Sequence, residues 1–105
     1  MPIYEKARPR PEKPTWFWLS FLDLSRPDGE KSLGVVITRA LDAQAAIVKA
    51  TVQVIPDDVV ETCEDCEVGV ATLSRGVPLK RYINRWILPA EAKHMSAGDY
   101  WITST

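Results

Sequence analysis

Two cysteines separated by two residues are the sharpest chemical feature of this sequence. They lie in the segment Cys63-Glu64-Asp65-Cys66, a spacing that lets two thiolates hold one Zn²⁺ ion. Zinc takes four ligands, so the single histidine, His94, and one carboxylate would have to complete a site within one chain. Two chains could instead supply four cysteines to a zinc-stabilised dimer. A disulfide is a further alternative, but we expect two free thiols and no cofactor.

Little in the sequence favours catalysis. The acidic residues beside Cys63 and Cys66 disfavour a thiolate and hence a thiol redox role. His94 is the only imidazole, and the chain contains no glycine-rich phosphate loop, Walker motif or His-Glu-x-x-His pair. We therefore expect a protein that is not an enzyme.

An acidic segment surrounds the cysteines. Residues 57–67 contain six carboxylates and no basic side chain. Such a segment can attract a basic partner, whereas the alternative is a solvated loop. The candidate partner-binding residues within it are Asp57, Asp58, Glu61 and Glu64.

A basic segment follows, with aromatic residues inside it. Tyr82 and Trp86 lie among Arg75, Lys80, Arg81 and Arg85. Basic side chains with interleaved aromatics can follow a phosphate backbone and stack bases, so these four basic residues are the candidate site of an alternative nucleic-acid-binding function. The spacing of Tyr82 and Trp86 also fits a helix that packs its aromatic side into the core, which is the interpretation that we favour.

Four tryptophans in 105 residues are many for a small domain. Trp16 and Trp18 fall on the same face of an expected strand. Tryptophans that stay exposed are candidate hot spots of a protein interface, and the alternative is that all of them are core. We include Trp16 and Trp18 in the predicted partner-binding surface.

The elements that must position these residues follow from the hydrophobic pattern. Residues 15–24 alternate with apolar side chains on both faces, which predicts a strand covered on both sides. A turn at 25–30 and a strand at 32–39 complete a hairpin. A helix capped by Asp42 follows, with an apolar stripe formed by Ala43, Ala46, Ile47, Ala50 and Val54.

The second half of the chain gives a shorter series of elements. The pattern predicts an acidic connection at residues 57–67 and a third strand at residues 67–74. Residues 79–88 are expected to form a short helix or turn. Pro89 starts a last helical turn through His94, and residues 99–103 form a short strand.

The order of elements predicts an α+β fold with a small antiparallel sheet. The order is β-β-α-β followed by a further helix and strand, with the helix packed on one face of the sheet. Residues 1–14, rich in proline and basic side chains, are expected to be a tail, and residues 15–105 a single domain.

Composition limits the environment and the partners. The net charge of −1 argues against general attraction to anionic membranes or nucleic acid. No apolar run is long enough for a membrane span, and the prolines near the N-terminus are unlike a secretory signal. We expect a cytoplasmic protein with no membrane partner, either a monomer or a homodimer.

Three short stretches resemble a family of small uncharacterised proteins of actinobacteria and their phages. They are WLSFLD at residues 18–23, LGVV at 33–36 before the alanine-rich helix, and NRWIL at 84–88 followed by Glu91. Members of that family carry an Asn-Pro-Gly-Gly turn after the helix, where this chain has Ile-Pro-Asp-Asp at 55–58. The resemblance implies a phage or prophage origin and no established activity.

The sequence thus predicts a small, non-enzymatic protein-binding module. A phage origin would make it a modulator or inhibitor of a host protein. A nucleic-acid-binding domain and a zinc-stabilised dimer are the alternatives.

Overall fold

The fold was analysed in a computed structural model that describes residues 13–73, 76–98 and 100–103. Residues 1–12 of the expected tail lie outside this range, and Lys13 and Pro14 are exposed.

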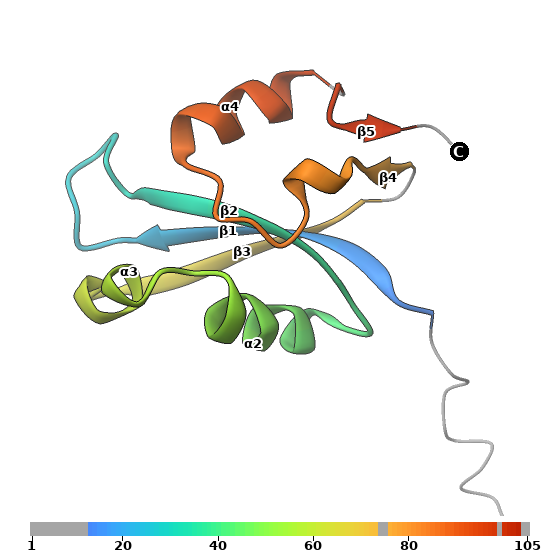
Figure 1. Cartoon of the computed structure of the whole chain (residues 1–105). Coiled ribbons are helices and arrows are strands. Elements are labelled where there is room, and N and C mark those ends of the chain that lie inside the picture. The colour runs from blue at the N-terminus through green and yellow to red at the C-terminus, as the bar shows by residue number, and fades with distance from the viewer. Residues whose placement is uncertain (1–12, 74–75, 99, 104–105) are drawn as a thin grey trace, which may run out of the picture.

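Three strands form the main sheet, in the order β2-β1-β3 with both pairings antiparallel (Figure 1). They are β1 (Thr15–Asp23), β2 (Ser32–Ala40) and β3 (Cys66–Thr72). The apolar residues on both faces of β1 predicted a strand covered on both sides, and β1 is the central strand. The α+β class, the antiparallel sheet and the three strands are therefore confirmed.

Helix α2 (Ala43–Gln53) covers one face of this sheet. The Asp42 side chain accepts a hydrogen bond of 2.8 Å from the Ala45 amide, which caps the helix as expected. Ala46 and Ala50 are completely buried, and their small side chains let the helix lie close to the strands. The buried residues on this face are Phe17, Leu19, Phe21, Val36, Ala46, Ala50 and Ile55.

A second helix, α3 (Asp57–Thr62), replaces the acidic connection expected from the sequence. Asp57 and Asp58 occupy its first turn, where negative charge is favourable beside the unpaired amides of a helix N-terminus. Val59 packs against the core of the α2 face. The high acidic content concealed this helix because it leaves few apolar positions from which to detect a helical period.

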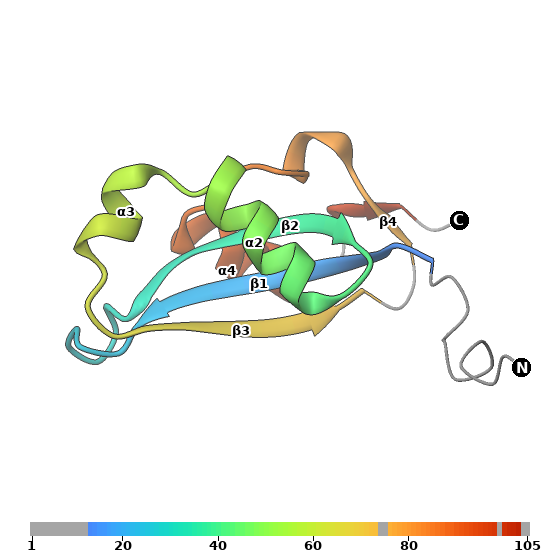
Figure 2. The same ribbon diagram turned by 90° about the horizontal axis from the view of Figure 1, so that it is seen from below.

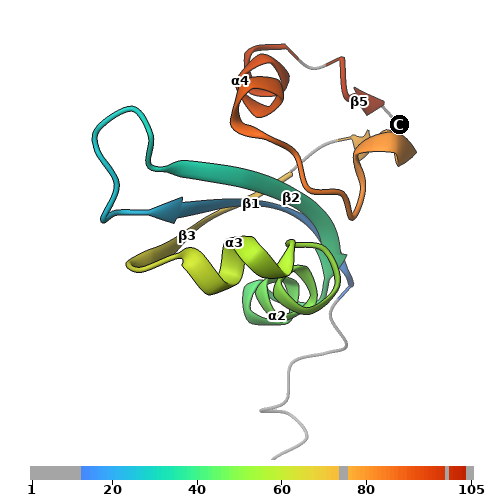
Figure 3. The ribbon, with the colours of Figure 1, turned by 60° about the vertical axis from the view of Figure 1, so that its left-hand side comes forward.

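The C-terminal segment covers the other face of the sheet (Figures 1 and 3). The pattern of the sequence predicts a helix on one face only, and the structure corrects this. The segment contains β4 (Val77–Pro78), the 3₁₀ helix η1 (Lys80–Tyr82), α4 (Pro89–Ala97) and β5 (Ile102–Thr103). The last expected strand is reduced to two residues, which pair with β4 in a separate small sheet.

A second buried cluster lies beneath this segment. It consists of Val35, Ile37, Tyr82, Ile87, Ala92, Met95 and Trp101, with Trp16 and Trp18 packed against it.

Residues 83–87 run along the outer edge of β2 instead of continuing the helix or turn expected over 79–88. The amides of Val35 and Ile87 each donate to the carbonyl of the other, over 2.8 and 3.0 Å. The Asn84 amide donates to the Ile37 carbonyl over 2.9 Å. The middle of the outer edge of β2, at Val35 and Ile37, is therefore covered by the protein's own chain.

Candidate functional site

The two edges of the sheet are unequal. The edge at β2 is hydrogen-bonded to residues 83–87, whereas no strand among the described residues pairs with the outer edge of β3. Figure 2 shows β3 along one side of the sheet, with α2 lying over the other strands and α3 at the end of the sheet, towards the β2 side. β3 is also exposed along most of its length, and Val70 keeps 45% of its surface accessible.

The register identifies which β3 residues face outward. The Leu24 amide donates to Asp65, and the Leu73 amide donates to Trp16, at the two ends of the β1–β3 pairing. Because hydrogen-bonded pairs alternate along an antiparallel ladder, the odd-numbered residues of β3 bond toward β1. The backbone groups of Val68, Val70 and Thr72 therefore point to the open edge. Their side chains lie on the α2 face, opposite Phe21, Leu19 and Phe17.

An apolar pocket of about 190 Å³ lies beside the start of β3 on the same face. Its walls come from the sheet, from the C-terminal part of α2 and from α3, and they include Phe21, Leu33, Ile55, Val59, Val60 and Val68. Cys63, Cys66 and Glu67 complete the side next to β3. No sequence pattern indicates this pocket, because its walls come from segments that only the fold brings together.

The acidic residues lie on exposed positions at this end of the molecule. Asp57, Asp58 and Glu61 are on α3, and Glu64 lies in the short loop that leads into β3. None of these four side chains forms a salt bridge with a described residue. Their negative charge therefore lies on exposed positions with no basic partner among the described residues.

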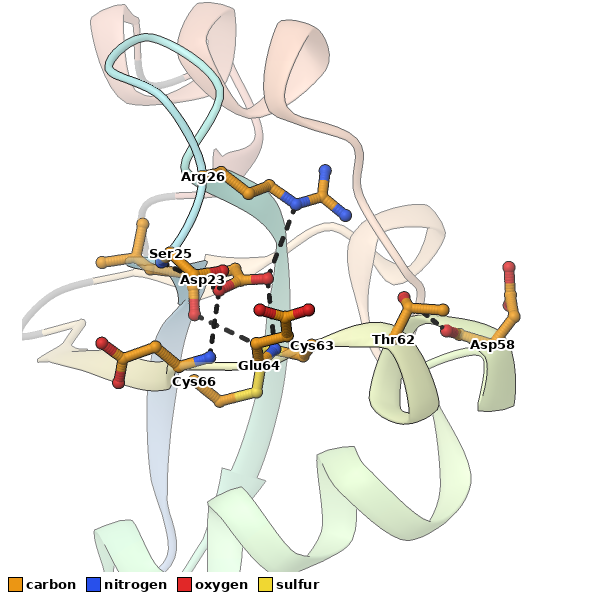
Figure 4. Close-up of a disulfide and its surroundings, with 10 residues drawn as sticks. Asp23, Ser25, Arg26, Asp58, Thr62, Cys63, Glu64 and Cys66 are labelled. Carbon is orange, nitrogen blue, oxygen red and sulfur yellow. Dashed lines mark hydrogen bonds and ion pairs between the residues drawn. A yellow bond between two sulfur atoms is a disulfide. The ribbon is translucent and has the colours of Figure 1, made fainter.

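Cys63 and Cys66 are joined by a disulfide, which corrects the expectation of free thiols (Figure 4). The chain reverses direction between α3 and β3, and this brings the two cysteines to a Cα–Cα distance of 5.8 Å. In this state the sulfurs are not available as thiolate ligands for zinc. The described residues also contain no group of three or more His, Cys, Asp or Glu side chains placed to hold a metal ion.

Asp23 fixes the loop that carries the disulfide. It is 2% exposed and accepts hydrogen bonds from the backbone amides of Glu64 and Asp65, over 3.3 and 3.1 Å (Figure 4). It also accepts from the amide and the hydroxyl of Ser25, over 3.0 and 2.6 Å, and Arg26 lies 3.6 Å away.

The bond from the Ser25 hydroxyl, together with those from the backbone amides, holds the pKa of Asp23 far below its usual range. The carboxylate is thus ionised at neutral pH, and its role is to position the loop.

Trp16 and Trp18 are half-buried on the face opposite α3. The Trp18 ring lies 5.2 Å from that of Trp101, and its Nε1 donates to the Ser20 hydroxyl over 3.0 Å. Arg39 lies over the Trp16 ring at 5.4 Å. The structure therefore does not bring these two tryptophans together with the acidic residues on one surface.

The basic segment is engaged within the fold at several points. Arg81 and Arg85 lie over the ring of Tyr82, at 5.4 and 5.9 Å, and Arg85 forms a salt bridge of 2.5 Å with Glu91. Lys80 is exposed, and Arg75 falls outside the described residues. Tyr82 is buried and Trp86 is partly buried, as the core interpretation predicted, although they pack on opposite faces of the sheet rather than on one helix.

His94 lies on an exposed position of α4, on the far side of the sheet from the disulfide. None of the described helices combines the length and the apolar character needed to cross a membrane.

The chain was also compared with known proteins. No protein-family model, no curated protein and no solved structure matches it.

Proposed function

We propose that this protein is a non-enzymatic binding module that captures a protein partner along one side, which we call the acidic edge. The acidic edge consists of residues 57–72: helix α3, the disulfide loop and the outer edge of β3.

The outer backbone groups of β3, which pair with none of the residues that the structure describes, are the observation that carries this proposal. An open strand edge readily accepts another strand, and proteins usually protect such edges with lysine, proline, a bulge or a covering segment. Here β2 is covered by residues 83–87. β3, by contrast, carries no lysine or proline and has an exposed valine, Val70. An edge left accessible beside a covered one favours a role in binding another chain.

The exposed carboxylates support a basic partner. Like charges gathered at one end of a small domain raise the rate of encounter with an oppositely charged surface. The tryptophans predicted as part of the contact surface are left out of the proposal, because they pack against the buried cluster on the other face. The resemblance to phage proteins extends the proposal to a modulator or inhibitor of a host protein.

Affinity capture from a cell lysate tests the proposal through matched variants. We expect Val70→Lys to reduce capture of the specific partner about tenfold, since a charge on the edge opposes strand addition. The quadruple change of Asp57, Asp58, Glu61 and Glu64 to Lys is expected to reduce it further and to reverse its salt dependence, because attraction to a basic partner becomes repulsion that salt screens. Partner amounts are measured by quantitative mass spectrometry.

Val77→Lys is the control, because Val77 is a strand valine that is 37% exposed but lies in the other sheet. It should leave capture unchanged. Circular dichroism must show that every variant is folded. Equal capture by wild type, Val70→Lys and the quadruple variant would show that the acidic edge does not bind the partner.

A further inference from the structure

We infer that the acidic edge binds an extended peptide segment that adds a fourth strand to the sheet and places a large apolar side chain, next to lysines or arginines, in the pocket beside β3. This inference rests on the proposed function and specifies the chemistry of its partner.

The requirement for an extended segment comes from the backbone groups on the open edge. Val68, Val70 and Thr72 present their N–H and C=O groups outward, at the spacing of an antiparallel ladder. An added strand satisfies these groups, and a helix cannot, because its own backbone groups are already bonded. The side chains of an added strand that lie opposite Val68 and Val70 share their face, which is also the face of the pocket.

The requirement for a large apolar side chain comes from the pocket. Its volume of about 190 Å³ is bounded mainly by valine, isoleucine, leucine and phenylalanine side chains. Apolar cavities of about 150 Å³ hold a benzene ring, so phenylalanine or leucine matches this space. Because Val68 is both a wall of the pocket and a member of the open edge, a side chain placed opposite Val68 can reach the pocket.

The requirement for basic residues comes from the charges at the start of β3. Glu64, Asp65 and Glu67 lie where the strand begins, and Asp57, Asp58 and Glu61 lie on the neighbouring helix. The end of an antiparallel peptide that reaches this position is its C-terminal end. Lysines or arginines that follow the apolar residue are thus placed beside Glu64, Asp65 and Glu67, and the carboxylates of α3 add attraction at longer range.

A second copy of the chain fits the same edge less well. Its β3 has no basic residue, and only cysteine, valine or threonine can occupy the positions on the pocket face. It would leave the pocket underfilled and the carboxylates without partners, so we assign the edge to a peptide of different sequence.

The test uses the full chain and the nine-residue peptide TVTVTFKRK. In an antiparallel register its phenylalanine lies opposite Val68 and its second valine opposite Val70. We expect binding that is measurable by fluorescence anisotropy below about 1 mM. Replacing the phenylalanine with aspartate, or the three basic residues with glutamates, should each weaken binding at least about tenfold, by loss of apolar burial or of charge attraction.

Amide hydrogen exchange followed by NMR tests the strand geometry directly. In the free protein the amides of Gly69 and Ala71 should be protected by β1, whereas those of Val68, Val70 and Thr72 should exchange rapidly. Saturation with the peptide should protect these three amides as well. In the protein, Val60→Trp should fill the pocket and lower the affinity for the phenylalanine-containing peptide about tenfold. Val77→Lys should leave this affinity unchanged.

Three results would overturn the inference. The first is no binding of the peptide at about 1 mM, and the second is binding without protection of the outward amides. The third is protection that rises with protein concentration in the absence of peptide, which assigns the edge to a second copy. If capture of a partner still depends on Val70 and on the acidic residues after any of these results, the proposed function stands and only its peptide chemistry is wrong.

Discussion

Gly34 shows how a single residue determines the packing of a distant segment. A Cβ atom at this position would lie 2.5 Å from the nearest carbon of the Trp86 indole ring. The missing side chain therefore lets Trp86 lie directly on the backbone of β2, where its ring is 6.0 Å from that of Phe21. Segments 33–36 and 84–88, far apart in the sequence, meet at this contact, so their residues have a structural role.

We expect Gly34→Ala to lower the free energy of unfolding by roughly 1–3 kcal/mol, because the indole must move away from its position on β2. Urea denaturation followed by circular dichroism measures the change. Gly69→Ala is the matched control, since a Cβ atom there would meet its nearest neighbour, the Cβ of Ser20, at an ordinary 3.7 Å. Equal stability of wild type and Gly34→Ala would show that the ring does not depend on this close approach.

At the scale of elements, the connection from α3 to β3 is the part of the fold that builds the candidate site. The helix supplies carboxylates and two walls of the pocket, and the strand supplies the open edge. Between them the disulfide closes a loop of four residues, and Asp23 of β1 holds that loop through two backbone amides. The acidic and apolar parts of the site therefore share one anchoring point on the central strand.

Reduction of the disulfide is expected to lower the free energy of unfolding by about 2 kcal/mol. A disulfide that closes a loop this short limits the conformational entropy of the unfolded chain by about this amount, and reduction removes that limit. The double variant Cys63→Ser, Cys66→Ser should show the same loss and no further response to reductant. Denaturation curves with and without dithiothreitol measure both. A thiol titration that finds two free thiols in the untreated native protein would contradict the bond itself.

At the scale of the whole molecule, the sheet is a shared layer between two buried clusters. One cluster lies beneath α2 and the other beneath the C-terminal segment, and both contain residues of β2. Val35 and Ile37 face one cluster and Val36 faces the other. Loss of packing on the C-terminal face should thus weaken the α2 face as well, as in a single cooperative unit.

Trp101→Ala tests this coupling. Trp101 is 4% exposed, stacks near Trp18 and donates a hydrogen bond to the Met95 carbonyl. We expect a loss of about 3–5 kcal/mol, the usual cost of removing a buried large aromatic side chain.

Chemical denaturation should give one transition with coincident fluorescence and circular dichroism signals. Tyr100→Ala is the neighbouring control, since Tyr100 is 53% exposed, and it should cost far less. Two separate transitions would show that the C-terminal segment unfolds independently.

Much of the fold was predictable because it is encoded in local patterns. The alternation in residues 15–24 predicted the central strand, and Val35–Ile37 with the turn before them predicted its antiparallel partner. Asp42 and the alanine stripe located α2 to within a residue at its start. The acidic residues of the candidate site were also evident, since charge and spacing are read directly from the sequence.

Other features were not predictable, because they depend on contacts between distant segments. Helix α3 is short and acidic, so it lacks the apolar period that identified α2. Residues 83–87 form no helix because their backbone groups find partners on β2 and Asn84 turns the chain with a φ of 54°, although the spacing of Tyr82 and Trp86 suggested a helix. Trp16 and Trp18 were predicted to join the acidic residues, and the twofold alternation of β1 places them on the opposite face.

By itself the sequence determined the local elements, the apolar character of both sides of β1 and the charge of residues 57–67, because hydrophobic period and charge are properties of neighbouring residues. Only the tertiary structure decided which edge of the sheet is covered, that an apolar pocket forms beside the acidic residues, and that Asp23 anchors the loop between them. Each of these depends on where segments far apart in the chain meet, and that position is set by the packing of the whole core.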